Sequence, residues 1–214
     1  GRHGKHLRLP WSSRFFSWRN FFLGIDRVLH FCERHRIHPW RKKAIKECEK
    51  WMTARFRKSG GLGAIFPPIV NALMAMRCLG YPDDHPDVLS QWKEIEAFEI
   101  GEGDTLRLQP CVSPVWDTAL CSMSLSAGGT APDDPALVKA GEWLLERRVR
   151  EKGDWAVKRP NAPVAAWYFE YANEFYPDVD DTVAVLMALD GIRLPNDAEK
   201  QAISRDAIEW VFAM

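Results

Sequence analysis

Three aspartates within four consecutive positions are the feature of this sequence best suited to acid–base chemistry. They lie in Asp178-Val179-Asp180-Asp181-Thr182, directly before an apolar run. Carboxylates at this spacing repel one another, so we expect at least one to have a raised pKa and to keep its proton. A protonated carboxyl in a dry, apolar site can act as a general acid. If an alkene is the base, a carbocation forms, and aromatic ring faces would have to stabilise it.

A helix cap is the plainer interpretation of the same residues. Asp and Thr are favoured at helix N-termini, and Pro177 suits the start of a helix. One carboxylate is enough to cap a helix, however, whereas this stretch carries three. We therefore interpret the cluster as a shared-proton site, in which one protonated Asp faces a cavity and the others are ionised or hydrogen-bonded around it.

Helices are the elements that must position these residues. Apolar residues recur at helical spacing along most of the chain, and no segment alternates convincingly as a strand would. The predicted helices cover residues 41–56, 67–79, 113–126, 134–150 and 178–189, and a further amphipathic helix occupies the residues before 214. Residues 2–18 are basic and aromatic with no clean period, and we interpret them as an irregular arm.

Two helix types repeat along the chain, which predicts how the helices are layered. One type carries a tryptophan among acidic and aliphatic residues; its examples contain Trp51, Trp143 and Trp210. The other type is apolar and follows a proline; its examples begin near Pro68, Pro114 and Pro177. The charged type suits an outer ring and the apolar type an inner ring, which predicts an all-α fold of the α/α-barrel kind. Aligning the repeats places Trp116 opposite Asp180, so we expect both to project into one apolar cavity.

Composition and charge exclude several classes of function. The 29 basic and 29 acidic side chains balance, so no basic field favours a nucleic-acid partner. The 5 cysteines are scattered without a C-x-x-C pair, which argues against a disulfide framework or a zinc site. No leader sequence is recognisable, and no apolar run is long enough to span a bilayer. A one-sided membrane contact remains open, and the basic run 34–46 could meet anionic headgroups or be a solvated helix face.

Several stretches resemble one known family. The segment Ser113-Pro114-Val115-Trp116-Asp117-Thr118 resembles the S-P-V-W-D-T segment of bacterial squalene–hopene cyclases, and Tyr176-Pro177 with the acidic cluster is similar to their D-x-D-D-T-A motif. Residues 139–145 and 153–161 are also similar to that family. D-x-D-D alone also occurs in class II diterpene cyclases, but the first segment fits them less well.

The resemblance implies roles for individual residues. Asp180 would be the proton donor to the terminal double bond of squalene, with Asp178 and Asp181 as its acidic partners. The substrate cavity would be lined by Trp116, Ile65, Pro67 and Phe169. No metal and no cofactor is expected at this step.

The resemblance also implies the wider setting. Residues 1–110 would be the C-terminal part of a first α/α-barrel domain, and residues 111–214 the N-terminal part of a second, catalytic one. The substrate would be squalene, drawn from one membrane leaflet at the cytoplasmic face of the bacterial inner membrane, and the product hopene or hopanol. A homodimer is compatible with the family. Both ends of the sequence look cut, so we expect a central fragment that is inactive alone.

Departures from the family pattern fall into two groups. Phe56 and Arg148 stand where the outer-helix Gln of a bracing repeat is expected, and Leu62 stands where its Trp is expected. Near the cavity, Phe66 and Glu170 replace glutamines, which could alter how the final cation is quenched.

Two alternatives remain open, a class II diterpene-type cyclase and a non-catalytic module. The chain could be a non-catalytic helical module that binds an isoprenoid and keeps the acidic cluster only as a helix cap. The second acidic motif, Asp83-Asp84-His85-Pro86-Asp87, matches the magnesium-binding D-D-x-x-D pattern of class I terpene synthases. Because prolines bracket it, we interpret it as a solvated loop, since the metal motif needs a continuous helix.

Overall fold

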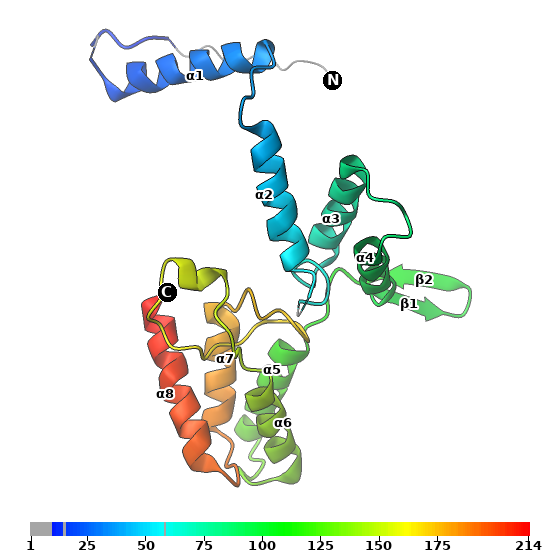
Figure 1. The fold of residues 1–214 in the computed structure, drawn as a ribbon. Coiled ribbons are helices and arrows are strands. Elements are labelled where there is room, and N and C mark those ends of the chain that lie inside the picture. The colour runs from blue at the N-terminus through cyan, green and yellow to red at the C-terminus, as the bar shows by residue number, and fades with distance from the viewer. Residues whose placement is uncertain (1–9, 15, 58) are drawn as a thin grey trace. The chain divides into compact units, whose positions relative to one another are not determined.

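The computed structural model describes residues 10–14, 16–57 and 59–214, and these residues are mostly helical (Figure 1). The α-helices are α1 (Trp18–Arg34), α2 (Arg41–Ala54), α3 (Phe66–Leu79), α4 (Pro86–Glu96), α5 (Pro114–Ala127), α6 (Pro135–Glu146), α7 (Val179–Asp190) and α8 (Asp197–Ala213). The 3-10 helix η1 (Asp154–Val157) precedes α7. The helical fold predicted from periodicity is confirmed, although α1 and α4 were not predicted.

One antiparallel hairpin departs from the expectation that the chain has no strands. Strand β1 (Glu99–Glu102) pairs with β2 (Thr105–Leu108), and Glu102 lies opposite Thr105 across the turn. Gly103 adopts φ +58° in that turn, a conformation that glycine reaches at little cost. The side chains of both strands are mostly exposed, so the sequence lacks the alternation of apolar and polar residues that would have predicted the strands.

The chain forms two compact units, residues 1–49 and 50–214, which we describe separately. In the first, α1 begins at Trp18, where the predicted irregular arm was expected to end; residues 1–9 of that arm lie outside the described residues. Ser17 caps the helix by accepting the Asn20 N–H at 3.2 Å. No helix among the described residues is long and apolar enough to cross a membrane.

In the second unit, helices α5 to α8 lie side by side around one core (Figure 1). The apolar helices α5 and α7 pack against each other. Helix α8 packs on α7, and α6 contacts α5 and α7. The core between them includes Val115, Leu144, Val185, Ala207 and the ring of Trp167. Burying these side chains is the main favourable term for this packing. The pairing of the two apolar helices supports their predicted inner position, whereas a closed barrel remains a prediction.

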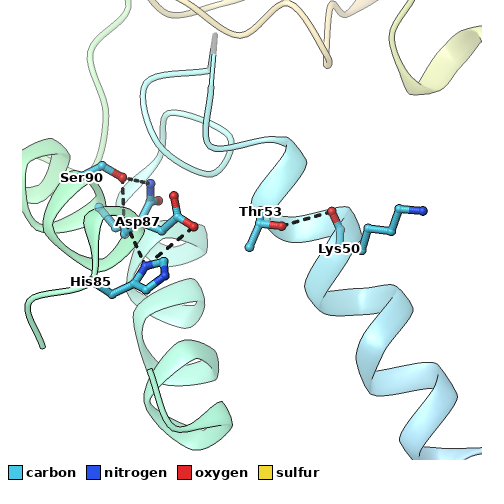
Figure 2. Close-up of polar contacts among 6 residues, drawn as sticks. Lys50, Thr53, His85, Asp87 and Ser90 are labelled. Atoms are coloured by element: carbon cyan, nitrogen blue, oxygen red, sulfur yellow. Dashed lines mark hydrogen bonds and ion pairs between the residues drawn. The ribbon is translucent and has the colours of Figure 1, made fainter. Parts of the chain in front are cut away.

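The Asp83–Asp87 stretch forms a turn and a helix start (Figure 2). Asp83 and Asp84 are exposed in the turn, and α4 begins only at Pro86. His85 Nδ1 accepts the Asp87 N–H at 3.1 Å, and Ser90 Oγ donates to the Asp87 carbonyl at 2.9 Å. These acidic residues therefore do not share one continuous helix; the loop interpretation holds for Asp83 and Asp84, whereas Asp87 lies in the first turn of α4 and is partly buried. In the same view, Thr53 donates its hydroxyl to the Lys50 carbonyl at 3.3 Å within α2.

Candidate active site

The first residue of the acidic cluster caps α7. Asp178 has an extended backbone, and its carboxylate accepts the Asp181 N–H at 2.7 Å. The Thr182 hydroxyl donates to the Asp178 carbonyl at 2.6 Å. The helix-cap interpretation is thus confirmed for one of the three carboxylates, and the other two need a separate account.

Trp167 fixes this cap to the core. The Asp178 N–H donates to the Trp167 carbonyl at 3.1 Å, and the Trp167 N–H donates to Thr182 Oγ1 at 3.0 Å. The indole N–H of Trp167 donates to the Leu144 carbonyl at 2.6 Å, and the whole residue is buried. The sequence did not predict this role of Trp167, because its hydrogen bonds to Asp178 and Thr182 join positions more than ten residues apart and leave no periodic pattern in the sequence.

Asp181 is the buried carboxyl of the cluster. Only 2% of the residue is exposed, and neither carboxylate oxygen has a hydrogen-bond partner among the described residues. Burial, and then the neighbouring carboxyl of Asp178, raise the pKa of Asp181 to about 8. The raised pKa agrees with the expected retained proton, but Asp181 is enclosed and lies outside the cleft lining, whereas the protonated carboxyl was expected to face a cavity.

Asp180, the predicted proton donor, lies on the exposed side of the first turn of α7. The two neighbours thus differ in access: the carboxyl of Asp180 can be reached from outside, whereas the oxygens of Asp181 are enclosed. A group that transfers a proton must come within hydrogen-bond reach of its acceptor. Of the two, only Asp180 meets this condition without rearrangement.

A cleft of about 500 Å³ lies beside the start of α7. It is lined by Ile65, Asp154, Trp155, Phe169, Glu170, Asn173, Phe175, Tyr176, Pro177 and Asp178. The predicted site residues Ile65, Phe169 and Asp178 are among them, and the lining is rich in aromatic rings.

The other predicted residues lie outside this lining. Asp180 and Asp181 follow it on α7, and Pro67 is exposed in the first turn of α3. Trp116 is partly buried on α5, and its ring centroid lies 6.3 Å from that of Phe169, which lines the cleft. The structure therefore does not place Trp116 and Asp180 together in this cleft.

An ion pair that was not predicted involves Asp154, one of the residues that line the cleft. Arg55, just after α2, donates Nε–H to Asp154 Oδ2 at 3.1 Å, and its guanidinium also pairs with the other oxygen. The same guanidinium lies 4.0 Å from the centroid of the Trp51 ring and 5.3 Å from that of Phe175. Burial, and then the charge of Asp154, raise the pKa of Tyr176 to about 12. Arg55 thereby joins α2 to the segment that leads into Asp178.

Glu170 is a second buried carboxyl in the cleft wall. It is 3% exposed, and Asn173 Nδ2 donates to its Oε2 at 3.2 Å. Burial is the main cause that raises the pKa of Glu170 to about 7, and the Asp178 carboxylate adds to the effect. The sequence indicated Glu170 only as a replacement for a glutamine of the family pattern and did not predict that its carboxyl is buried.

The site therefore combines carboxyls that hold protons near neutral pH with a cleft of aromatic walls. Such a combination can deliver a proton to an apolar substrate and can stabilise positive charge through ring faces.

Comparison with known proteins agrees with this description. Residues 1–104 match the squalene–hopene cyclase N-terminal domain, and residues 112–214 match the squalene–hopene cyclase C-terminal domain. Together the two matches account for almost the whole chain, which therefore belongs to the squalene–hopene cyclase family. The family predicted from the sequence motifs is confirmed.

Individual relatives show how much of a whole protein this chain represents. A squalene–hopene cyclase of Alicyclobacillus acidocaldarius is 38% identical over 90% of the chain, and one of Zymomonas mobilis is 36% identical over 92%. A dammaradiene synthase of Dryopteris crassirhizoma is 36% identical over 100% of it. The chain spans 31% of the length of each of these three relatives.

Proposed function

We propose that this chain supplies the acid-bearing part of a squalene–hopene-type cyclase, an isomerase that folds squalene into a polycyclic triterpene. The observation that carries the proposal is the carboxyl cluster at the start of α7, where the buried Asp181 keeps a proton beside the accessible Asp180. The names of the relatives point to the same substrate and reaction.

In this mechanism Asp180 donates its carboxyl proton to the terminal double bond of squalene. The alkene electron pair forms the new C–H bond, and a tertiary carbocation remains on the neighbouring carbon. Successive double bonds attack the cation and close the rings. The last cation either loses a proton, giving hopene, or adds water and releases one of that water's protons, giving hopanol. Asp178 and Asp181 would be the acidic partners of the donor at the start of α7.

The substrate would lie along aromatic and apolar side chains. Ile65 and Phe169 line the cleft, and we assign Trp116 and Pro67 to the same substrate surface. The contact between Trp116 and Phe169 supports a continuous aromatic wall. We further propose that residues 1–110 and 111–214 belong to two α/α-barrel domains, which the pairing of α5 with α7 supports.

The first unit supports contact with one membrane leaflet, which we place at the cytoplasmic face of a bacterial inner membrane. Helix α1 carries an apolar stripe whose exposed members include Trp18 (77%), Phe22 (59%) and Leu29 (61%). Arginines and lysines follow the helix in residues 34–46 and suit anionic headgroups. A helix of this kind lies in the membrane interface without crossing it. A homodimer, which the family resemblance allows, stays a prediction.

The test is the D180N substitution in the full-length protein that contains this chain. Loss of the general acid should lower the yield of pentacyclic product from squalene about 100-fold or more. The matched control is D84N, which changes an exposed aspartate in the turn before α4. Equal product formation by D180N and the unmodified protein would refute the assignment, and mass spectrometry of the products would identify the skeleton formed.

A further inference from the structure

The two residues that lead into Pro177 and Asp178 pack in a cluster of aromatic rings around Arg55. The Arg55 guanidinium lies 4.0 Å from the centroid of the Trp51 ring and 5.3 Å from that of the Phe175 ring. The centroid of the Tyr176 ring lies 6.5 Å from that of Trp51 and 6.5 Å from that of Phe175. One cation and three rings therefore meet directly before the cap of α7.

Polar contacts fix the Arg55 side chain within this cluster. Its Nε–H donates to Asp154 Oδ2 at 3.1 Å, and the guanidinium also pairs with the other carboxylate oxygen. The Nη1 group donates to the Trp51 carbonyl at 2.8 Å, and the side chain is 12% exposed. The planar fork of an arginine suits a place where one group both pairs with a carboxylate and stacks on rings.

The turn that carries Asp154 approaches the same stretch through its backbone. A β-carbon at Gly153 would lie 2.6 Å from the Phe175 carbonyl oxygen and 3.0 Å from the carbonyl carbon. Any side chain at Gly153 would therefore displace one of the two backbones, which explains a glycine at this position. Phe175 is thus contacted both by the backbone of the turn and by the guanidinium that the turn holds.

We propose that Arg55 is a positioning residue for the acidic cluster: together with Gly153 and Asp154 it clamps residues 175–176 and so sets where α7 begins. Its effect on cyclisation rests on the function proposed above, whereas the clamp itself does not. The cleft lining, as far as the structure describes it, does not include Arg55. Arg55 therefore acts through the clamped stretch and not by touching the substrate.

The clamp reaches the acids through a short and stiff piece of chain. Pro177, whose ring fixes its φ angle, is all that separates Tyr176 from Asp178. Asp178 caps α7 by accepting the Asp181 N–H at 2.7 Å, and Asp180 lies in the first turn of that helix. A displacement of the clamped stretch would therefore move the start of α7 and the proton donor with it. A shift of about 1 Å at a reacting group is enough to cost a large factor in rate.

The first test is steady-state kinetics of R55M in the full-length protein with squalene. Rates are measured below the melting range of each variant and are scaled to the amount of folded protein. We expect kcat to fall about 10-fold while KM stays within about twofold, because the acid is displaced and the substrate surface keeps its residues. R55K should recover part of kcat, since it keeps a positive charge beside Asp154.

The matched control is R77M, which breaks an arginine–aspartate pair with Asp83 whose side chains are 71% and 82% exposed. It should leave both kcat and KM in place. A role of Arg55 in stability alone would leave kcat per folded molecule unchanged in R55M, and that outcome overturns the proposal.

Hydrogen exchange of the substrate-free protein tests the clamp without any activity. In R55M we expect the backbone amides of residues 173–178 to exchange about 10-fold faster, while those of α4 keep their rates. G153A, which forces the turn away from Phe175, should have the same effect and serves if R55M does not fold. Unchanged exchange in either folded variant overturns the clamp. If the unmodified protein cyclises no squalene, the proposed function fails, and the exchange rates still decide the clamp.

Discussion

The backbone N–H of Trp167 donates to the hydroxyl of Thr182 at 3.0 Å, and that hydroxyl in turn donates to the Asp178 carbonyl. A single side chain thus links the buried tryptophan to the cap of α7. We predict that T182V leaves the Trp167 N–H buried without an acceptor and lowers stability by about 1–3 kcal/mol.

T182S is the matched control for this substitution, because it keeps the hydroxyl and removes only a methyl group. The melting temperature of the full-length protein should fall clearly for T182V and only slightly for T182S. Equal losses in the two variants would show that the methyl group matters and the hydrogen bonds do not.

The ion pair between Arg55 and Asp154 should stabilise the cleft. The Arg55 side chain is 12% exposed and that of Asp154 is 33% exposed, so the pair is partly screened by solvent. We expect R55M to cost about 1–2 kcal/mol, because it leaves Asp154 without its charged partner. R55K should recover only part of the loss, since lysine cannot form the two-pronged contact or stack equally on Trp51.

A double-mutant cycle with D154N separates this pair from other effects. If the R55M and D154N losses simply add in the double variant, the two side chains do not interact and the prediction is wrong. The cycle is best read from melting temperatures at low and moderate salt, because a partly exposed pair weakens as salt is added.

The raised pKa of Asp181 predicts how stability depends on pH. The folded protein holds this proton up to about pH 8, whereas an unfolded aspartate releases it near pH 4. Between these values the folded state binds more protons than the unfolded state, so stability is greatest at the acidic end and falls as the pH rises. Glu170, with a pKa of about 7, contributes in the same direction over a narrower range.

The D181N variant tests this dependence, because its amide does not titrate. Melting temperatures measured between about pH 5 and pH 8 should fall less steeply for D181N than for the unmodified protein. Parallel curves would show that Asp181 is ionised in the folded state at neutral pH.

Helix α1 should govern binding to lipid. We predict that F22D, which places a charge in its apolar stripe, reduces co-sedimentation of the full-length protein with vesicles of anionic phospholipid. The control is E33Q on the polar side of the same helix, which should bind at least as well as the unmodified protein. Undiminished binding by F22D would place the lipid contact elsewhere.

Sequence reasoning predicted the parts of the site that depend on local pattern. The acidic cluster indicated the start of α7, and the apolar helices α5 and α7 follow from their periodicity. The motifs also led to Ile65 and Phe169, which line the cleft. What the pattern could not predict is which aspartate is buried, because that depends on packing around α7.

Other parts of the structure rest on contacts between distant segments. Arg55 and Asp154 are 99 positions apart, and neither lies in a motif that suggests a partner. Trp167 could be recognised as a buried residue, but its backbone pairing with Asp178 depends on the path of the whole intervening segment. Helix α1 was missed because the sequence pattern predicted an irregular arm over residues 2–18 and no element over the residues that follow it.

The bridge between Trp167 and Asp178 has a consequence for how this site can vary. Because the bridge closes the intervening segment at its base, residues such as Tyr171 and Glu174 can change in size or number while the base stays anchored. The segment also carries Phe169, Glu170 and Phe175, which form the cleft wall. Substitutions in this segment can therefore change the shape of the cleft while Asp178, at the start of α7, stays bonded to Trp167.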